Sequence, residues 1–317
     1  MEAQLWWHGE VVWYLYLAGL GAGAVVVSAS ALLRGRGQGG DFQMARYGAF
    51  IGPIAVMLGT SLLVFELGRP FRALNLFKVI NLSPMSIGSW FLLFFIALCL
   101  VYAAAFLPSY APHYKQLNHY GATIRRALAW FMLPLGIGVA VYTGVLLGAM
   151  PARPLWNSPI LAFLFVISAL STGVAAVILV SSLFHKKSTN LDHEEQYHQS
   201  AYVLTATDTI FVGIELLIIF LFMMFAQLTI GNVKYAVAVV LPGGEMAALF
   251  WFWVVFVGLV APGLIELAYI IPKLTYGRGF RMPKMVEILV AVSVLVGGYM
   301  LRYVIVVAGQ ITGPVGL

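Results

Sequence analysis

Residues 160–184, ILAFLFVISALSTGVAAVILVSSLF, decide the fold class of this chain, because this stretch contains no Asp, Glu, Lys or Arg. A helix rises ~1.5 Å per residue, so about 20 apolar residues cross the ~30 Å hydrocarbon core of a bilayer. Lipid offers no hydrogen-bond partner to the backbone, and a helix satisfies its own backbone groups. The stretch therefore predicts a membrane-spanning helix.

Comparable apolar runs occur along the whole sequence. It is 62% hydrophobic and only 9% charged, which excludes an ordinary soluble enzyme. We predict an all-α, polytopic membrane protein with eight transmembrane helices in two four-helix bundles. Residues 1–317 would form a single integral membrane domain. The predicted spans are residues 11–33, 47–67, 87–107, 127–149, 160–184, 202–228, 246–271 and 285–308.

The basic residues between the spans predict the orientation, because Lys and Arg are retained on the cytoplasmic side of a membrane. The connections after spans one, three, five and seven hold twelve of them and the opposite side holds five, while Arg302 within span eight completes the eighteen. Both termini are therefore expected in the periplasm, with the protein in the cytoplasmic membrane of a prokaryote. The first run lacks a signal-peptide pattern and is expected to remain as an anchor.

The composition also excludes several kinds of site. A single cysteine, Cys99, cannot form an intrachain disulfide, an iron–sulfur site or a Cys-based zinc site. The histidines lie outside the predicted spans, which argues against ligation of haem b within the membrane. We expect residues 192–195 and His198 to form a solvated, charged loop and not a metal site. The basic residues are spread between the spans, so nucleic-acid binding is not expected.

Ionisable residues inside the predicted spans are costly in lipid and usually functional. Asp208 precedes Glu215 by seven residues, so both lie on one helical face about 10 Å apart. Carboxylates on one face suit a proton relay, while hydrogen bonding between helices by protonated carboxyls is the structural alternative. The predicted proton pathway consists of Asp208, Glu215, Glu266 and Glu287. For Glu66 and Glu287, simple access to water at a span end remains an alternative.

A second polar group gathers at the opposite side of the predicted membrane. The headgroup of a quinone needs hydrogen-bond donors for two carbonyl oxygens, aromatic walls and a supply of protons. Tyrosine and arginine can donate, and glutamate can carry protons. The predicted quinone-binding residues are Tyr142, Glu66, Arg302, Tyr14, Glu10, Arg69 and Trp90. The connection 69–84 is amphipathic and is expected either to lie on the membrane surface or to receive a partner.

The glycines of the first span predict close helix packing. Gly19, Gly21 and Gly23 have the small-residue spacing that lets neighbouring helices approach. A nucleotide-binding glycine motif would need a preceding strand, which an apolar span does not provide.

Several motifs, taken in order, resemble the polysulfide reductase membrane subunit family, also called the NrfD-like family. Individually they are short, but together they extend from the first span to the eighth. They are residues 13–23 (WYLYLAGLGAG), 66–70 (ELGRP), 83–90 (SPMSIGSW), 142–144 (YTG), 297–303 (GGYMLRY) and 308–310 (AGQ).

The resemblance implies a quinone-binding subunit that has no complete activity alone and belongs to a respiratory oxidoreductase. It implies menaquinone or ubiquinone as an exchangeable substrate, with no haem or iron–sulfur cluster in this protein. The implied partners are a four-cluster iron–sulfur subunit on the periplasmic side and a molybdopterin catalytic subunit or a cytochrome. Tyr142 matches the quinone-contacting tyrosine of the family, whereas some members have His and Asn where this sequence has Val11 and Tyr14.

Two other functions remain open from the sequence. A secondary transporter or proton channel would also bury carboxylates along a path through the membrane. A passive membrane anchor would need neither a quinone site nor a proton pathway.

Overall fold

The computed structural model describes residues 9–35, 39–66, 83–107, 115–185, 191–229, 231–277 and 279–312. All regular secondary structure in these residues is helical, and eight of their helices are long and apolar enough to cross a membrane. The predicted all-α fold with eight spans is therefore confirmed.

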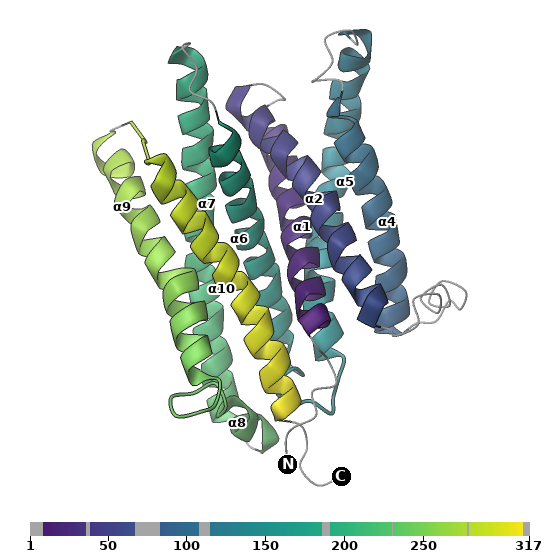
Figure 1. The fold of residues 1–317 in the computed structure, drawn as a ribbon, viewed down its shortest axis with the longest axis vertical. Helices are drawn as coiled ribbons and strands as arrows, with labels where there is room; N and C mark the ends of the chain where they lie inside the picture. The colour runs from purple at the N-terminus through teal and green to yellow at the C-terminus, as the bar shows by residue number, and fades with distance from the viewer. Residues whose placement is uncertain are drawn as a thin grey trace.

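The helices run alternately up and down through the molecule (Figure 1). They are α1 (Gly9–Arg34), α2 (Gly39–Glu66), α4 (Pro84–Ala104), α5 (Lys115–Gly148), α6 (Pro159–Phe184), α7 (Leu191–Leu228), α8 (Asn232–Val237), η4 (Leu249–Val260), α9 (Ala261–Tyr276) and α10 (Lys284–Ile311).

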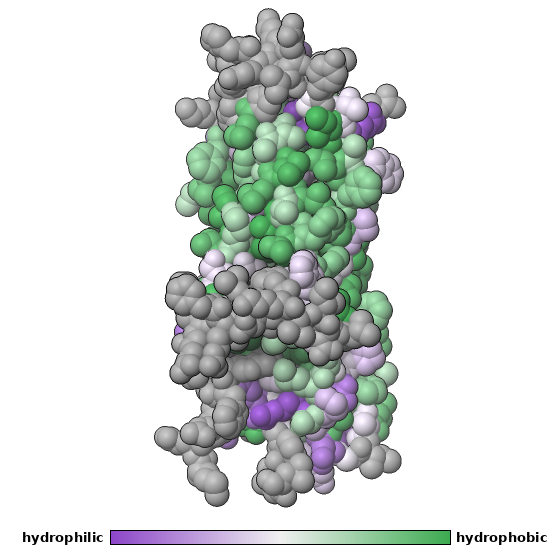
Figure 2. Space-filling view, turned by 90° about the vertical axis from the view of Figure 1, so that its right-hand side faces the viewer, coloured by the Kyte–Doolittle hydropathy of each residue, from purple (hydrophilic) through white to green (hydrophobic). Residues whose placement is uncertain are grey.

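The two ends of the molecule can be named from α1, as the Gly9 end and the Arg34 end. Figure 1 shows the start of α1 and the end of α10 at the Gly9 end. In the face shown in Figure 2, hydrophobic side chains form a broad band, with hydrophilic side chains nearer the two ends. This distribution is the one expected for helices that cross a hydrocarbon layer.

Helix α1 lies at the centre of the molecule. It packs against α2, α5, α6 and α10. In its most apolar stretch 89% of the residues are buried, compared with 33% in α4, which packs against α2 and α5. Because α1 packs extensively on α6, the protein has a continuous core, and the division into two four-helix bundles remains a prediction.

Glycines allow α1 to approach its neighbours closely, as predicted. A Cβ atom added at Gly23 would lie 1.9 Å from the carbonyl oxygen of Ala169 in α6. One added at Gly173 would lie 2.3 Å from the backbone of Gly23, and one at Gly21 would lie 2.6 Å from Val56 of α2. Such backbone contact supplies the van der Waals packing that holds helices together in lipid.

The amino-terminal part of α7 corrects one prediction. Residues 192–195 are mostly exposed, as predicted, but they form the first turns of this helix, so the prediction of a loop was wrong. The acidic residues Asp192 and Glu194 lie in the first turn, where negative side chains interact favourably with the helix dipole. The predicted span 202–228 contained only the apolar part of a helix that starts at Leu191.

Span seven is composed of two helical forms. It begins as the π-helix η4 and continues as the α-helix α9, with Pro262 at the start of α9. Gly258 of η4 and Gly297 of α10 meet backbone to backbone, because a Cβ on either would lie 2.2–2.5 Å from the other glycine. This contact holds the irregular part of span seven against α10.

The connection between α5 and α6 is attached to the end of α10. The indole Nε1 of Trp156 donates to the carbonyl oxygen of Ile305 at 2.8 Å, and Arg153 donates to that of Gln310 at 2.7 Å. Gly309 makes room for the Trp156 ring, since a Cβ there would lie 1.9 Å from Nε1. At the Gly9 end of the molecule, these hydrogen bonds thus connect two segments that are distant in the sequence.

Replacing Gly23 tests the packing of α1 on α6. We expect Gly23→Val to lower the melting temperature of the purified protein, because overpacking a close contact costs about 1–3 kcal/mol. Gly213→Ala is the matched control, since a Cβ at Gly213 meets nothing within 4 Å. Thermal unfolding in detergent measures both variants, and equal melting temperatures would contradict the inferred contact.

Candidate functional site

Tyr142 of α5 points into the protein, toward α4. A Cβ added at Gly88 of α4 would lie 1.7 Å from Cζ and 1.9 Å from the hydroxyl oxygen of Tyr142. A side chain at position 88 would displace the tyrosine ring, so the glycine allows the ring to lie there. Tyr142 is partly buried against the core.

Tyr14 of α1 lies beside Tyr142. Its side chain is 0% exposed, and its hydroxyl has no hydrogen-bond partner among the described residues. The two phenols are near enough to interact electrostatically. Because a buried unsatisfied polar group costs about 1–3 kcal/mol, such a hydroxyl usually marks the position of a water molecule or ligand. Tyr14, Gly88 and Tyr142 are called the tyrosine site below.

The remaining predicted quinone residues near the Gly9 end are placed less closely. Glu10 is exposed in the first turn of α1, and Trp90 of α4 is 42% exposed. Arg69 and the side chain of Glu66 lie outside the described residues, although Glu66 is the last residue of α2. Membership of these four residues in a quinone site therefore stays a prediction.

Arg302 belongs to a different cluster. It is 0% exposed in α10, and its Nη1 donates to the Ser168 hydroxyl at 2.5 Å and to the Gly298 carbonyl at 2.8 Å. The guanidinium also lies 5.4 Å from the ring centre of Phe165 and 6.0 Å from that of Tyr16. Among the described residues, no contact joins Arg302 to Tyr142.

The charge that faces Arg302 is Glu215 of α7. The two side chains interact electrostatically, and Ser168 also hydrogen-bonds to the Glu215 carboxylate. Ser168 thus accepts from the arginine and donates its own hydrogen to the glutamate. Both side chains are buried, and the attraction between opposite charges would offset part of the cost of burying them in a medium of low dielectric constant.

Helix α1 separates the tyrosine site from Arg302 and Glu215. Tyr14 and Tyr16 are two residues apart and therefore point to nearly opposite sides of the helix. Tyr14 faces Tyr142, whereas Tyr16 faces Arg302 and packs edge-on against Tyr299 of α10. The predicted quinone residues are consequently divided between two sides of one helix.

Two further acids lie deeper toward the Arg34 end, and a third lies at the start of α10. Asp208 of α7 is 1% exposed and accepts a hydrogen bond from Ser171 at 2.7 Å. Glu266 of α9 is 0% exposed and contacts the Thr209 hydroxyl at 2.8 Å. Glu287, in the first turn of α10, accepts a hydrogen bond from Ser182 at 2.6 Å.

Helix α6 therefore supplies a serine to several levels of the predicted proton pathway. Ser168 interacts with Arg302 and Glu215. Ser171 donates to Asp208, and Ser182 donates to Glu287. These serines were not predicted from the sequence, although hydroxyls in an otherwise apolar span were visible there. Between Ser171 and Ser182 the buried face of α6 is mostly apolar, so the Glu287 level is separate from the others.

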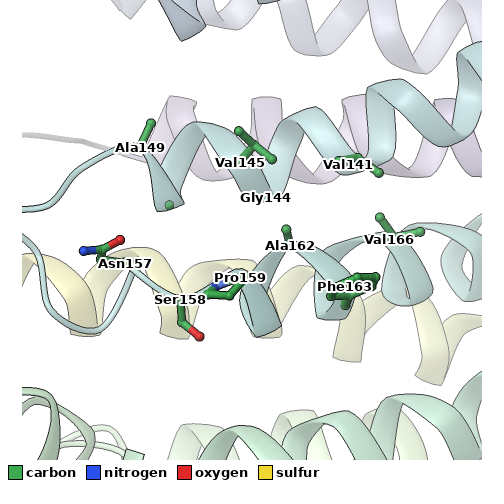
Figure 3. A pocket seen from close by; sticks show the side chains of 11 residues that line it. Val141, Gly144, Val145, Ala149, Asn157, Ser158, Pro159, Ala162, Phe163 and Val166 are labelled. Atoms are coloured by element: carbon green, nitrogen blue, oxygen red, sulfur yellow. The ribbon is translucent and has the colours of Figure 1, made fainter.

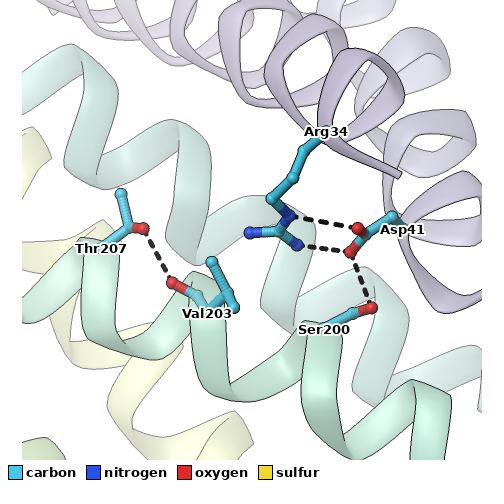
Figure 4. Close-up of polar contacts among 5 residues, drawn as sticks. All are labelled: Arg34, Asp41, Ser200, Val203 and Thr207. Atoms are coloured by element: carbon cyan, nitrogen blue, oxygen red, sulfur yellow. Dashed lines mark hydrogen bonds and ion pairs between the residues drawn. The ribbon is translucent and has the colours of Figure 1, made fainter. Parts of the chain in front are cut away.

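Polar contacts at the Arg34 end hold α1, α2 and α7 together (Figure 4). Arg34 pairs with Asp41, and the Ser200 hydroxyl donates to the same carboxylate at 2.7 Å. Beside them, His185 stacks on Tyr197 with ring centres 3.7 Å apart and lies 3.2 Å from Glu194. Among the described residues, no three His, Cys, Asp or Glu side chains are grouped as a metal site would require.

A groove of about 530 Å³ lies between α5 and α6 (Figure 3). Val141, Val145 and Phe163 line it together with small residues, while Asn157 and Ser158 lie at one end. Tyr142 is not among its lining residues, and no ionisable group of the described residues lines it. The groove is suited to an apolar chain and provides no group for proton or electron chemistry.

Comparison with known proteins identifies the family. Residues 1–314 match the family described as "Polysulphide reductase, NrfD". The C chain of the polysulfide reductase of Wolinella succinogenes is 31% identical, with 96% of this sequence and 94% of that protein covered. Protein NrfD of Escherichia coli is 32% identical, with 96% and 95% covered. The C subunit of the selenate reductase of Mesobacillus selenatarsenatis is 23% identical, with 96% and 74% covered. This multi-pass membrane protein belongs to the NrfD family of polysulfide reductase membrane subunits, and it is a membrane subunit of a redox complex.

Proposed function

We propose that this protein binds quinone, exchanges two electrons between that quinone and a partner subunit, and exchanges two protons with a pathway in the membrane. The observation that carries the proposal is the buried, unpartnered hydroxyl of Tyr14 beside Tyr142. Phenol hydroxyls can donate to the carbonyl oxygens of a quinone and can accept from the hydroxyls of a quinol. Gly88 keeps the Tyr142 ring in place for such a contact.

The position of the tyrosine site suits electron transfer to a docked partner. Tyr14 lies five residues, or about 8 Å, from the start of α1 at the Gly9 end. A periplasmic iron–sulfur subunit bound at this end would approach the quinone closely. Two relatives are named as single components of a polysulfide reductase and a selenate reductase, which supports a complex with a separate catalytic subunit. The segment 69–84, predicted to dock the partner, lies mostly outside the described residues.

Protons must move together with the electrons. Oxidation of a quinol releases two electrons to the partner and two protons to the protein or solvent, and reduction of a quinone takes up the same number. Glu215, Asp208 and Glu266 form a buried set of proton carriers on the other side of α1. Glu287 with Ser182, at a separate level nearer the Arg34 end, would exchange protons with the cytoplasm. Menaquinone or ubiquinone would be the exchangeable substrate, and no haem or iron–sulfur cluster would belong to this protein.

A proton channel or secondary transporter is the second candidate, and the buried carboxyls favour it. Such a protein would need no redox partner. Isolation of the protein with a cysteine-rich, ferredoxin-like protein supports the quinone function. Solute or proton transport by the isolated protein would support the alternative.

The tyrosine site is tested by removing single hydroxyls. We expect Tyr142→Phe and Tyr14→Phe each to lower quinol-linked kcat/KM by up to about tenfold, because one hydrogen bond contributes roughly 0.5–1.5 kcal/mol. Quinol oxidation by the purified complex measures the effect, and the partner subunit should still co-purify. Tyr235→Phe is the matched control, since Tyr235 is 78% exposed. Unchanged kinetics in both site variants would reject the tyrosine site.

The electrostatic attraction between Arg302 and Glu215 should stabilise the protein. Arg302→Met should lower the melting temperature, because the lost guanidinium offsets the buried negative charge of Glu215. Adding Glu215→Gln removes that charge and should restore much of the lost stability. Thermal unfolding of the two single variants and the double variant measures this coupling. A double variant less stable than Arg302→Met would show that the two side chains do not form a compensating pair.

The proposed orientation is tested by labelling with a membrane-impermeant maleimide. Glu10→Cys at the Gly9 end should react in intact cells, and Asp192→Cys at the Arg34 end should react only after lysis, because both positions are exposed. The native Cys99 is buried and gives a low background. The opposite labelling pattern would place the termini in the cytoplasm.

A further inference from the structure

Asp208 and Glu266 each have one oxygen that receives no hydrogen bond from a hydroxyl, an amide or a cation of the described residues. Asp208 Oδ1 accepts from Ser171, and Glu266 Oε2 contacts Thr209, so the oxygens left over are Asp208 Oδ2 and Glu266 Oε1. The two carboxyl groups nevertheless lie within hydrogen-bonding reach of each other. Two carboxylates cannot bond to each other without a proton, since each would only accept.

The hydrogen count at Thr209 shows how weakly Glu266 is supported as an anion. Its hydroxyl lies 3.0 Å from the carbonyl oxygen of Thr205 and 2.8 Å from Glu266 Oε2. A hydroxyl carries one hydrogen, so it cannot donate fully to both acceptors. Glu266 Oε2 therefore receives only part of one hydrogen bond, which is weak support for a full negative charge on this carboxyl.

We propose that Asp208 and Glu266 share one proton between Oδ2 and Oε1 and form a carboxylic acid–carboxylate pair that links α7 to α9. One shared proton provides a hydrogen bond between the two oxygens that otherwise have no partner. The Ser171 hydroxyl stabilises the carboxylate of Asp208. The pair accepts a second proton to become two neutral acids and returns to the singly protonated form when it releases that proton. As a proton store this pair rests on the proposed function, whereas the pairing itself does not.

The surroundings of the pair favour storage over a permanent ion. The only charged group that faces it among the described residues is Glu215, which is also acidic. No described cation interacts with either carboxyl, whereas Glu215 interacts electrostatically with Arg302. Burying two full negative charges there would be far more costly than keeping one shared proton. Glu266 also lies one turn beyond Pro262, where η4 changes to α9, so it follows the least regular part of this span.

Stability measurements on the whole purified complex test the pairing. Glu266→Gln and Asp208→Asn place an N–H donor where the shared proton was, and their melting temperatures should stay close to that of the wild type. Glu266→Ala and Asp208→Ala each remove the hydrogen-bond partner of the other carboxyl and should lower the melting temperature. The double alanine variant should lose little beyond the worse single variant. Additive losses, or amide variants as unstable as the alanine variants, would overturn the pairing.

Proton-linked turnover tests the storage role. With a pH-indicator dye in single-turnover quinol oxidation, Asp208→Asn and Glu266→Gln should each slow proton movement by about tenfold or more. The double amide variant should be no slower than the slower single one, because both substitutions remove the same proton. Losses that multiply would indicate two separate carriers and overturn the shared proton, and wild-type rates in both single variants would overturn the storage role.

Glu245→Gln, at an exposed position, is the control for these measurements and should leave turnover unchanged. A wild-type complex without quinol turnover would reject the proposed function, while the stability cycle still decides the pairing.

Discussion

The backbone contact between α1 and α6 sets the position of both polar sites. At Gly23 and Gly173 the two helices touch without any intervening side chain. In lipid, apolar side chains gain little by leaving the bilayer, so helix association depends on close packing and polar contacts. Because α1 is held in the centre of the molecule, one of its faces meets α5 and the other meets α10. A larger residue at this crossing would displace the helix that carries both Tyr14 and Tyr16.

Buried polar groups deep in the molecule are supported by helices other than their own. Arg302 depends on Ser168 and a carbonyl in α6, and Glu215 depends on Arg302. Asp208 receives a hydroxyl from α6, and Glu287 receives another. An isolated helix could not insert these charges cheaply, so the polar groups stabilise the assembled bundle and not the separate spans. The serines of α6 thereby serve both assembly and the proposed movement of protons.

The separation of the tyrosine site from the acids has a chemical consequence. Within the proposed function, a quinone bound beside Tyr142 would lie on the opposite side of α1 from the Glu215–Arg302 pair. Electron transfer at the Gly9 end and proton storage deeper in the membrane would then occur in different parts of the molecule. Tyr16 lies between them, in contact with Arg302 and Tyr299. Any coupling between the two reactions must therefore pass through α1 or through water.

The sequence by itself determined the eight spans, the packing role of Gly23 and the family, because hydrophobic length, small-residue spacing and ordered motifs are properties of the sequence alone. It also indicated which acids lie at depth. Only the tertiary structure decided which side chains meet. Arg302 was grouped with Tyr142 because both lie toward the same end, yet depth along the membrane says nothing about the direction in which a side chain points. The pairing of Asp208 with Glu266 depends on how α7 and α9 are rotated about their axes, and long-range packing sets that rotation.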